Sequence, residues 1–424
     1  MKILYVTQYY PPEVAAPASR ASELARHWVA EGHEVTILTG FPNHPTGKVP
    51  PEYWAKLRRL VCREEIDGVD VVRTWLLPVP NRKPLERMLN YTSFMLSASL
   101  TGLFVGRPDV VIATSPQLLV GLAGWWLARV KRVPSIFEVR DLWPESMVAS
   151  GVGSDRSKVV RLLARVSAFL YRRSDHIVVV TDAFRRELEE KWHVPPERIS
   201  VVENGVETEL FAPTGPTLAE LGASAVPEGF VVSYVGTLGL AHGLDTVLDA
   251  AATLRDSLPA ARFLFIGEGA DRERLVGIAR ERGLSNVTFL PQQPRGLIPA
   301  YIRASDVCLV PLRRSEVFKT VIPTKTLEFM ACARPIVLGV EGQIRQIVEE
   351  ASAGVAVPPE DASALAQAIQ HLHDHPDLRR SLGLSGRQYV QRRFSRREKA
   401  LGYLSVLEGI RSRLARSLPS TAAR

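Results

Sequence analysis

The stretch PTKTLEFMACARPIV, Pro323–Val337, is the one that decides the fold of this chain. It predicts a loop, a helix opened by Pro323 and then a buried strand, because proline suits the first turn of a helix. Thr324 or Thr326 is expected to cap free backbone amides of that turn. Three apolar residues at helical spacing should pack inward, namely Leu327, Met330 and Ala331.

Lys325 and Glu328 are three positions apart and should project from the same side of this helix. A helix N-terminus that carries a lysine suits an anion, because free N–H groups and the helix dipole both favour negative charge. A carboxylate one turn later suits hydrogen bonds from hydroxyl groups, such as those of a ribose. The alternative is an exposed Lys–Glu pair on a surface helix, and the helix alone does not decide between the two.

The same stretch resembles the P-S-K-x-x-E-Y-M-A-x-G-K-P-V-V signature of retaining GT-B glycosyltransferases of family 4. More narrowly, the chain resembles the WbuB-like branch of that family, which builds bacterial surface polysaccharides. The resemblance runs from Met1 to about Phe394. It implies an α/β protein with two Rossmann-like domains facing across a cleft, in which Lys325 binds the donor diphosphate and Glu328 binds the nucleotide ribose.

The composition is that of a globular protein with an anionic partner. A length of 424 residues suggests two or three domains. The formal net charge of +8 suits nucleotides, diphosphates or an anionic membrane surface, and no RNA-binding signature or aromatic–basic platform points to nucleic acid. Cys62, Cys308 and Cys332 lack metal spacing and cannot all pair, which favours a reducing cytoplasm. The N-terminus does not resemble a signal peptide.

The first half of the chain is typical of a doubly wound parallel sheet. The strand Lys2–Thr7, the helix Ala18–Glu31 and the strand Glu34–Thr39 form its first unit. Relatives usually carry glycines in the first loop, whereas this loop reads PPEVAAPASR, so Glu13 and Arg20 are expected to contact a ligand on the acceptor side. A plain surface loop is the alternative.

Two further segments of the first half resemble the WbuB-like branch. Phe41–Tyr53 is too rich in proline and glycine for regular structure and should lie at the cleft rim. FEVRDLWPESM, Phe137–Met147, predicts a strand that runs into a loop where open α/β sheets bind ligands. Asp141 is a candidate for orienting the sugar or the acceptor, and Arg140 is a candidate on the acceptor side. A structural Arg140–Asp141 ion pair is the alternative.

Leu89–Gly106 is an uncharged run of 18 residues, which reaches the minimum length of a membrane span. Its polar residues and its place inside a βα repeat favour a helix that is buried on one side and touches lipid on the other. Arg82, Lys83 and Arg87 precede it and suit an anionic leaflet or the diphosphate of a polyprenyl carrier. A plain buried helix is the alternative. The pair Trp125–Trp126 in the next helix is interpreted as core, with an anchor at a membrane interface as the alternative.

The second half starts the βα pattern again, with a strand at Phe230–Gly236 and a helix at Leu244–Leu258. The resemblance implies that the donor is bound by Gly236, Thr237, His242, Gly243, Gly267, Glu268, Lys325, Thr326 and Glu328. Thr237 and His242 stand where the family has an arginine and a lysine on the diphosphate, so Lys325 and helix N–H groups are the expected source of positive charge. Thr320 stands where the family has the first of two glutamates.

The domain organisation follows from these patterns. We expect an N-terminal acceptor-side domain over residues 1–211, a linker over 212–228, a donor-binding domain over 229–394, a helix over 395–416 that crosses back to the N-terminal domain, and a disordered tail over 417–424.

The residues and the resemblance together predict a retaining glycosyltransferase that moves a sugar from a nucleotide diphosphate, expected to be a UDP-sugar, to a hydroxyl of a glycan or lipid-linked acceptor. The catalytic candidates are Asp141, Lys325 and Glu328. No paired carboxylates suggest a metal, so we expect neither metal nor other cofactor. The protein is expected in the cytoplasm, peripheral at the inner face of the plasma membrane. The alternatives are a GT-B nucleotide-sugar epimerase and a degenerate binding subunit, the latter suggested by Thr237, His242 and Thr320.

Overall fold

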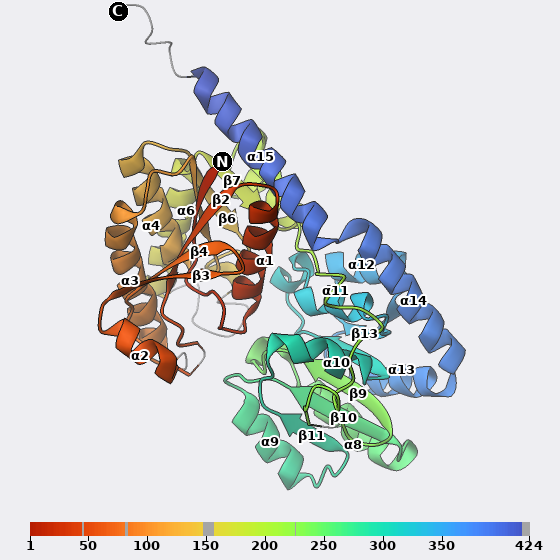
Figure 1. Cartoon of the computed structure of the whole chain (residues 1–424). Coiled ribbons are helices and arrows are strands. Elements are labelled where there is room, and N and C mark those ends of the chain that lie inside the picture. The colour runs from red at the N-terminus through yellow and green to blue at the C-terminus, as the bar shows by residue number, and fades with distance from the viewer. Residues whose placement is uncertain (45, 81–83, 147–156, 225, 418–424) are drawn as a thin grey trace, which may run out of the picture. The chain divides into compact units, whose positions relative to one another are not determined.

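The computed structural model describes residues 1–44, 46–80, 84–146, 157–224 and 226–417, and it divides them into two compact units (Figure 1). The first unit is formed by the chain up to Glu203 together with the residues from Arg397 onward, and the second by Asn204 to Arg396. Each unit is built on one largely parallel sheet with helices on both faces. The predicted pair of Rossmann-like α/β domains is confirmed.

The sheet of the first unit has the strand order β3-β4-β2-β1-β5-β6-β7-β8. Its strands are β1 (Lys2–Val6), β2 (Glu34–Gly40), β3 (Val61–Ile66), β4 (Val69–Thr74), β5 (Val110–Thr114), β6 (Ser135–Val139), β7 (His176–Val179) and β8 (Ile199–Val201). All neighbours pair in parallel except β3, which runs antiparallel to β4 at the edge. The apolar runs predicted as strands are buried because helices cover both faces of a parallel sheet.

Two groups of helices cover this sheet on opposite faces, as Figure 1 shows. On one face lie α1 (Ala16–Ala30) and α15 (Arg396–Ser417), and on the other lie α3 (Pro84–Thr101), α4 (Leu118–Lys131) and α6 (Lys158–Arg173), with α7 (Asp182–Glu190) between β7 and β8 in the chain. Trp28 of α1 donates its indole N–H to the carbonyl of Ala400 in α15 at 3.0 Å. The C-terminal helix therefore packs into the core of the N-terminal unit.

Two predictions about this unit are wrong in part, and one strand was not predicted. Phe41–Tyr53 is not wholly irregular, because α2 (Pro51–Leu57) begins inside it with Pro51 in the first helical turn, where proline is favoured. The tryptophan pair is not wholly core, because Trp126 is 47% exposed while Trp125 packs edge-on against Phe169. The edge strand β3 was not predicted, because its alternating exposure gives it no buried run.

The uncharged run of the sequence forms most of α3 and the 3-10 turn η1 (Gly102–Phe104) that follows it. Phe94 and Ala98 of α3 are fully buried against the sheet, whereas leucines face outward. No helix among the described residues is both long enough and apolar enough to cross a membrane.

The sheet of the second unit is wholly parallel, with the order β11-β10-β9-β12-β13-β14. Its strands are β9 (Phe230–Val235), β10 (Ala261–Ile266), β11 (Val287–Leu290), β12 (Val307–Pro311), β13 (Ile336–Gly339) and β14 (Gly354–Ala356). One face is covered by α10 (Ile298–Arg303), α11 (Thr324–Ala331), α12 (Gln343–Glu350) and α14 (Pro376–Arg393), and the other by α8 (Asp245–Ser257), α9 (Arg272–Glu281) and α13 (Ala362–Asp374).

The division between the units falls after Glu203, whereas the N-terminal domain was predicted to end at residue 211. Val206 donates its backbone N–H to Phe394 at 2.9 Å, and Phe211 is fully buried in the core of the second unit. The expected linker also packs there, since Leu218 is buried and Arg303 donates to the carbonyl of Pro216. In the expected tail, Ser417 belongs to α15, and residues 418–424 lie outside the described residues.

Candidate active site

Lys325 lies on the first turn of α11, and its ammonium is buried against the end of β9. The Nζ atom stands 3.8 Å from the centroid of the Tyr234 ring and has no hydrogen-bond partner among the described residues. Burial lowers the pKa of Lys325 to about 7, although the negative charge of Glu328 acts in the opposite direction. A buried cation that lacks a hydrogen-bond acceptor is costly to the fold and is ready to receive an anion.

Gly236 makes room for this ammonium. A Cβ at Gly236 would stand 2.6 Å from Lys325 Nζ, and the φ of +142° is one that side chains rarely adopt. A Cβ at Gly267, at the end of the neighbouring β10, would stand 2.0 Å from the carbonyl oxygen of Gly236. The two glycine turns at the ends of β9 and β10 are therefore in backbone contact, which brings the predicted positions 236, 267 and 325 together.

The predicted threonine cap of α11 is wrong. The helix begins at Thr324 after Pro323, and no side chain caps its N-terminus in the described structure. Thr326 is fully buried, and its Oγ1 has no hydrogen-bond partner within the part of the chain that the structure describes. The prediction that three apolar residues of α11 pack inward is confirmed, and these are Leu327, Met330 and Ala331.

Glu328 is buried and already paired. Its Oε1 accepts a hydrogen bond from Nη1 of Arg295 at 3.0 Å, and only 9% of the residue is exposed. Arg295 belongs to the turn η4 (Arg295–Leu297) before α10, and its guanidinium lies 5.0 Å from the centroid of the Phe211 ring. Arg295 was not among the predicted site residues, because no sequence motif includes it. Only the tertiary structure brings its guanidinium to Glu328.

His242 occupies the place where the family has a lysine, and it is an uncharged group there. Its ring lies 5.8 Å from that of Tyr234, and its Nδ1 is buried without a hydrogen-bond partner in the described ranges. Burial, together with the charge of Lys325, lowers the pKa of His242 to about 3. The imidazole therefore adds no positive charge beside Lys325 at neutral pH.

The remaining donor-side candidates lie around this cluster. Gly243 has a φ of +56° and closes the turn η3 (Leu240–His242). Thr237 is exposed, and its carbonyl accepts a hydrogen bond from the Tyr234 hydroxyl at 2.7 Å. Glu268 is turned toward Arg272, with 3.6 Å between Oε1 and Nε. Thr320 donates its hydroxyl to the carbonyl of Val317, so it does not stand in for a carboxylate.

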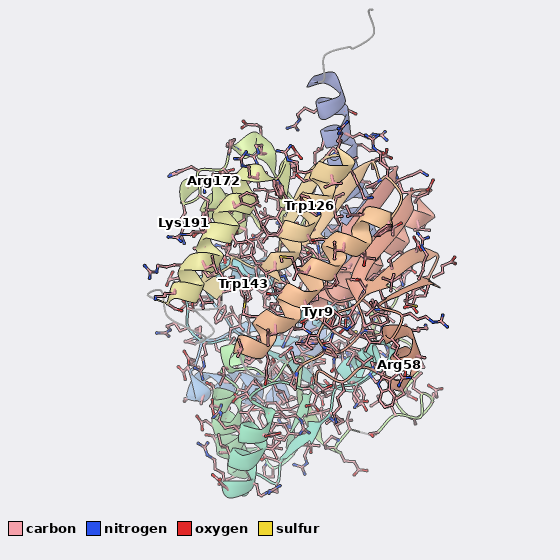
Figure 2. The ribbon with its side chains drawn as sticks, turned by 90° about the vertical axis from the view of Figure 1, so that its left-hand side faces the viewer. Tyr9, Arg58, Trp126, Trp143, Arg172 and Lys191 are labelled. Carbon is pink, nitrogen blue, oxygen red and sulfur yellow. The ribbon has the colours of Figure 1, made fainter. Side chains whose placement is uncertain are left out.

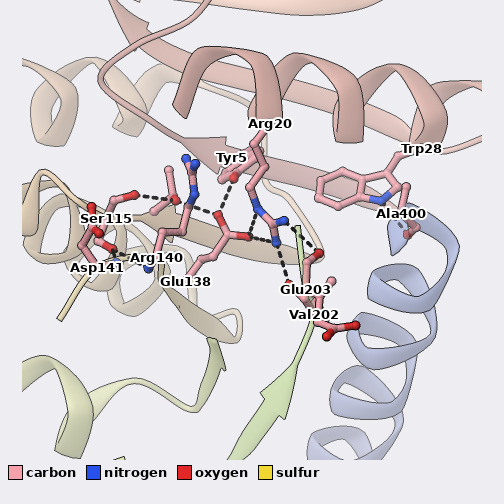
Figure 3. Close-up of polar contacts among 11 residues, drawn as sticks. Tyr5, Arg20, Trp28, Ser115, Glu138, Arg140, Asp141, Val202, Glu203 and Ala400 are labelled. Atoms are coloured by element: carbon pink, nitrogen blue, oxygen red, sulfur yellow. Dashed lines mark hydrogen bonds and ion pairs between the residues drawn. The ribbon is translucent and has the colours of Figure 1, made fainter. Parts of the chain in front are cut away.

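In the N-terminal unit, Glu138 at the end of β6 is the centre of a buried polar network (Figure 3). Its carboxylate is fully buried and accepts hydrogen bonds from Arg20 at 2.9 and 3.1 Å, from the Tyr5 hydroxyl at 2.7 Å and from the Thr114 hydroxyl at 2.6 Å. Burial alone would raise the pKa of Glu138, but the charges of Arg20 and Arg140 and these hydrogen bonds hold it below its usual value.

Arg20 is committed to this network rather than to a ligand. Its guanidinium is 1% exposed and donates to the carbonyls of Val202 and Glu203, at 3.1 and 3.2 Å, as well as to Glu138. The expectation that Arg20 contacts an acceptor therefore has no geometric support. The residue instead ties α1 to the end of β6 and to the segment after β8.

Arg140 and Asp141 follow β6 and do not form the ion pair considered as an alternative. The backbone N–H of Arg140 donates to Oγ of Ser115 at 2.7 Å, and that of Asp141 reaches the same atom at 3.4 Å (Figure 3). Nε and Nη1 of Arg140 are buried and lack hydrogen-bond partners among the residues that the structure describes. Burial raises the pKa of Asp141 to about 6, against the effect of Arg140.

Glu13 and His44 lie at the ends of β1 and β2, on the same edge of the sheet as Arg140. The Glu13 carboxylate accepts backbone N–H groups of Asn43 and His44, both at 2.9 Å, so it holds the loop rather than pointing into open space. Burial raises the pKa of Glu13 to about 7, against those hydrogen bonds. Burial and the charge of Arg87 lower the pKa of His44 to about 4. Arg82 and Lys83 lie outside the described residues.

Two family profiles match this chain. The profile described as Glycosyl transferase 4-like domain matches residues 16–205, and the one described as Glycosyl transferases group 1 matches residues 223–389. Among known proteins, the chain is similar to the putative colanic acid biosynthesis glycosyl transferase WcaI of Escherichia coli K12. The two are 26% identical over 385 residues, which cover 87% of this chain and 91% of WcaI.

Two solved structures share the fold of nearly the whole chain. Sucrose-phosphate synthase of Thermosynechococcus elongatus has a TM-score of 0.77 at 22% identity, and the match covers 97% of this chain and 99% of the synthase. HepE of Anabaena, solved in complex with UDP-glucose, has a TM-score of 0.71 at 17% identity, and the match covers 96% of this chain and all of HepE.

Proposed function

This chain belongs to the glycosyltransferases of family 4 with the GT-B fold, and we propose that it moves a sugar from a UDP-sugar to a hydroxyl of a glycan or lipid-linked saccharide in surface polysaccharide biosynthesis. The name of WcaI supports the pathway class, and the UDP-glucose bound to HepE supports the nucleotide. The single observation that carries the proposal is the buried ammonium of Lys325, which lies without a hydrogen-bond acceptor, among the described residues, on the first turn of α11.

On the donor side, the proposed role of Lys325 is to hold the diphosphate as it leaves. The bond between the anomeric carbon and the phosphate oxygen breaks, and negative charge gathers on the diphosphate. A preorganised cation and free helix N–H groups stabilise that charge most in the transition state. His242, being neutral, packs beside the ammonium without adding charge.

On the acceptor side, we assign Asp141 to orienting the incoming hydroxyl and Arg140 to binding a polar or anionic group of the acceptor. The pKa of Asp141 near 6 keeps the carboxylate mostly ionised at neutral pH, so it can orient the acceptor hydroxyl by accepting a hydrogen bond from it. The two guanidinium nitrogens of Arg140 that lack partners among the described residues can donate to the acceptor. Glu13 ties the loop after β1 to the loop after β2.

We propose retention at the anomeric carbon, with the acceptor attacking on the face that the diphosphate leaves. The acceptor proton then passes to the departing diphosphate, and no covalent sugar–enzyme bond is needed. The test is to incubate the protein with UDP-, GDP- and ADP-sugars and a polyprenyl-diphosphate saccharide, and to identify products by mass spectrometry and anomeric configuration by NMR. Inversion would overturn retention, and epimerised free donor without transfer would favour the epimerase.

Glu328→Ala is expected to weaken UDP binding by about 1–3 kcal/mol, because ribose hydroxyls would lose their acceptor. Calorimetry on the full chain measures this effect. Arg295→Ala is the matched control, since it removes the partner of Glu328 in the free protein but leaves the carboxylate in place. Equal losses in the two variants would mean that Glu328 acts only by holding Arg295.

Turnover is expected to persist in EDTA. The sequence offers no paired carboxylates after a strand as a metal holder, and we assign the stabilisation of the diphosphate to Lys325 and the amides of α11. Initial rates with and without chelator, on protein washed free of divalent cations, measure this. Loss of activity in EDTA that Mg²⁺ or Mn²⁺ restores would contradict the prediction.

A further inference from the structure

Helix α3 presents leucine to the outside. From Leu85 to Thr101, the residues that are about half exposed or more are all leucines, and these are Leu85, Leu89, Leu96 and Leu100. The opposite side of the helix is buried, with Phe94 and Ala98 packed on the sheet. A surface helix of a soluble domain normally places polar and charged residues on its outer face. The outer face of α3 therefore lacks the composition that water favours.

The neighbouring elements extend this apolar surface. Helix α3 packs on α4, and α4 packs on α6, so the three helices form one layer, which faces the viewer in Figure 2. Phe104 is 90% exposed in η1, and Trp126 is 47% exposed on α4. Ten exposed apolar side chains make up this surface, which we call the leucine face. They are Leu85, Leu89, Leu96, Leu100, Leu103, Phe104, Trp126, Val130, Val159 and Leu162.

The exposed charges on the helices of the leucine face are basic, although Glu86 on α3 is partly exposed and Asp175 is exposed just after α6. The exposed charged residues of α3, η1, α4 and α6 and of the segments that directly follow α3 and α4 are Arg107, Arg129, Arg132, Lys158, Arg161, Arg165, Arg172 and Arg173. No acidic residue is exposed in the described parts of these elements. Arg172 is labelled on α6 in Figure 2, in the same layer as Trp126. An apolar centre with a mainly basic surround is complementary to an anionic lipid surface.

The second unit serves as an internal comparison. Ten of the seventeen large apolar side chains that are exposed in the described residues belong to the leucine face. The second unit has four, and they lie on separate elements, at Leu210, Leu221, Leu240 and Leu384. Single exposed apolar residues are normal on soluble proteins, whereas a contiguous patch marks an interaction surface.

We propose that the leucine face docks on an anionic lipid bilayer. The leucines, Phe104 and Trp126 enter the boundary between headgroups and acyl chains, while the arginines of α4 and α6 lie against anionic headgroups. A second copy of this chain is a poorer occupant, because self-association through this face would bring two sets of basic residues together. The docking concerns where the protein works and depends on no step of the proposed reaction.

The test is sedimentation of the full chain with vesicles of phosphatidylcholine alone and of phosphatidylcholine with phosphatidylglycerol. Binding is expected only to the anionic vesicles and should weaken as salt rises. The triple variant Leu96→Ser, Leu100→Ser and Phe104→Ser is expected to lose about a thousandfold in affinity, since each large apolar side chain contributes roughly tenfold when buried. Arg161→Glu, Arg165→Glu and Arg173→Glu together should lose at least about a hundredfold and weaken the salt dependence.

Matched controls on the second unit separate docking from general stickiness or charge. Leu221→Ser with Leu384→Ser removes exposed leucines of the second unit, and Arg280→Glu, Arg380→Glu and Arg392→Glu makes the same change in net charge. Both controls should bind vesicles like the unchanged protein, and all variants should keep UDP affinity. Failure to sediment at low salt, equal losses in the controls, or a dimer in light scattering that only the leucine-face variants abolish would each overturn the proposal.

Discussion

Lys325→Ala is expected to lower kcat by about two to three orders of magnitude while leaving the unfolding temperature unchanged or raised. The catalytic loss follows from removing the only ammonium that the described residues place at the N-terminus of α11 beside Gly236. The fold should not be destabilised. A buried charge without a hydrogen-bond partner in the described structure lowers the free energy of unfolding, so its removal does not reduce stability. Lys325→Met, which keeps the length of the side chain, is the matched control for packing.

The pH dependence of stability is a second test of the buried Lys325 ammonium. The folded pKa of Lys325 is about 7, against 10.5 for an unperturbed lysine. Between these values the unfolded chain binds more protons than the folded one, so this residue makes the free energy of unfolding rise with pH across that window. Urea titrations between pH 7 and pH 10 should show this rise in the unchanged protein and a smaller one in Lys325→Met.

Nucleotide binding should raise the lowered pKa of Lys325 again. A diphosphate beside Nζ favours the charged form, so UDP binding near pH 8 is expected to take up close to one proton. Calorimetry in buffers of different ionisation enthalpy measures the uptake, and Lys325→Met should show none. If turnover survives in Lys325→Ala while the unfolding temperature drops, Lys325 is a structural residue and the proposed function loses its main support.

Arg20→Ala is expected to destabilise the N-terminal unit by about 3–5 kcal/mol, because it leaves the Glu138 carboxylate charged and unpaired by any cation at full burial. In a domain of this size, that corresponds to a fall of roughly 10 °C in unfolding temperature. Thermal unfolding followed by calorimetry measures it. Arg20→Met with Glu138→Leu should recover much of the loss, since both charges are then removed.

The exposed pair of Arg63 and Asp70 provides the control for this prediction. Their side chains lie 2.9 Å apart at the edge of the same sheet, and both are substantially exposed. Arg63→Ala is expected to change stability by no more than about 1 kcal/mol. If Arg20→Ala costs no more than Arg63→Ala, the Glu138 network is not a structural centre, and Arg20 returns as a candidate ligand-binding residue.

Local sequence patterns determined the secondary elements around the site. The apolar spacing in Pro323–Val337 is enough to predict α11 and its buried side, because burial of one helix face imposes that period. A short apolar run ended by glycine predicted β9 in the same way. The uncharged run before Arg107 predicted a helix whose outer face is apolar, since the run contains no charged residue that could face the solvent.

Tertiary structure decided what these residues touch. Lys325 and Glu328 were expected to act as neighbours, yet the ammonium lies over Tyr234, 91 positions earlier in the chain, and the carboxylate is paired with Arg295. Arg20 and Arg140 looked equivalent as loop arginines, but only the first is enclosed by Glu138 and backbone carbonyls. Periodicity reports which side of an element is buried, whereas the choice among polar partners depends on groups that approach from distant parts of the chain. The sequence by itself therefore determined the α/β units and the elements that carry the candidate site, and only the fold decided which of the charges on those elements are paired.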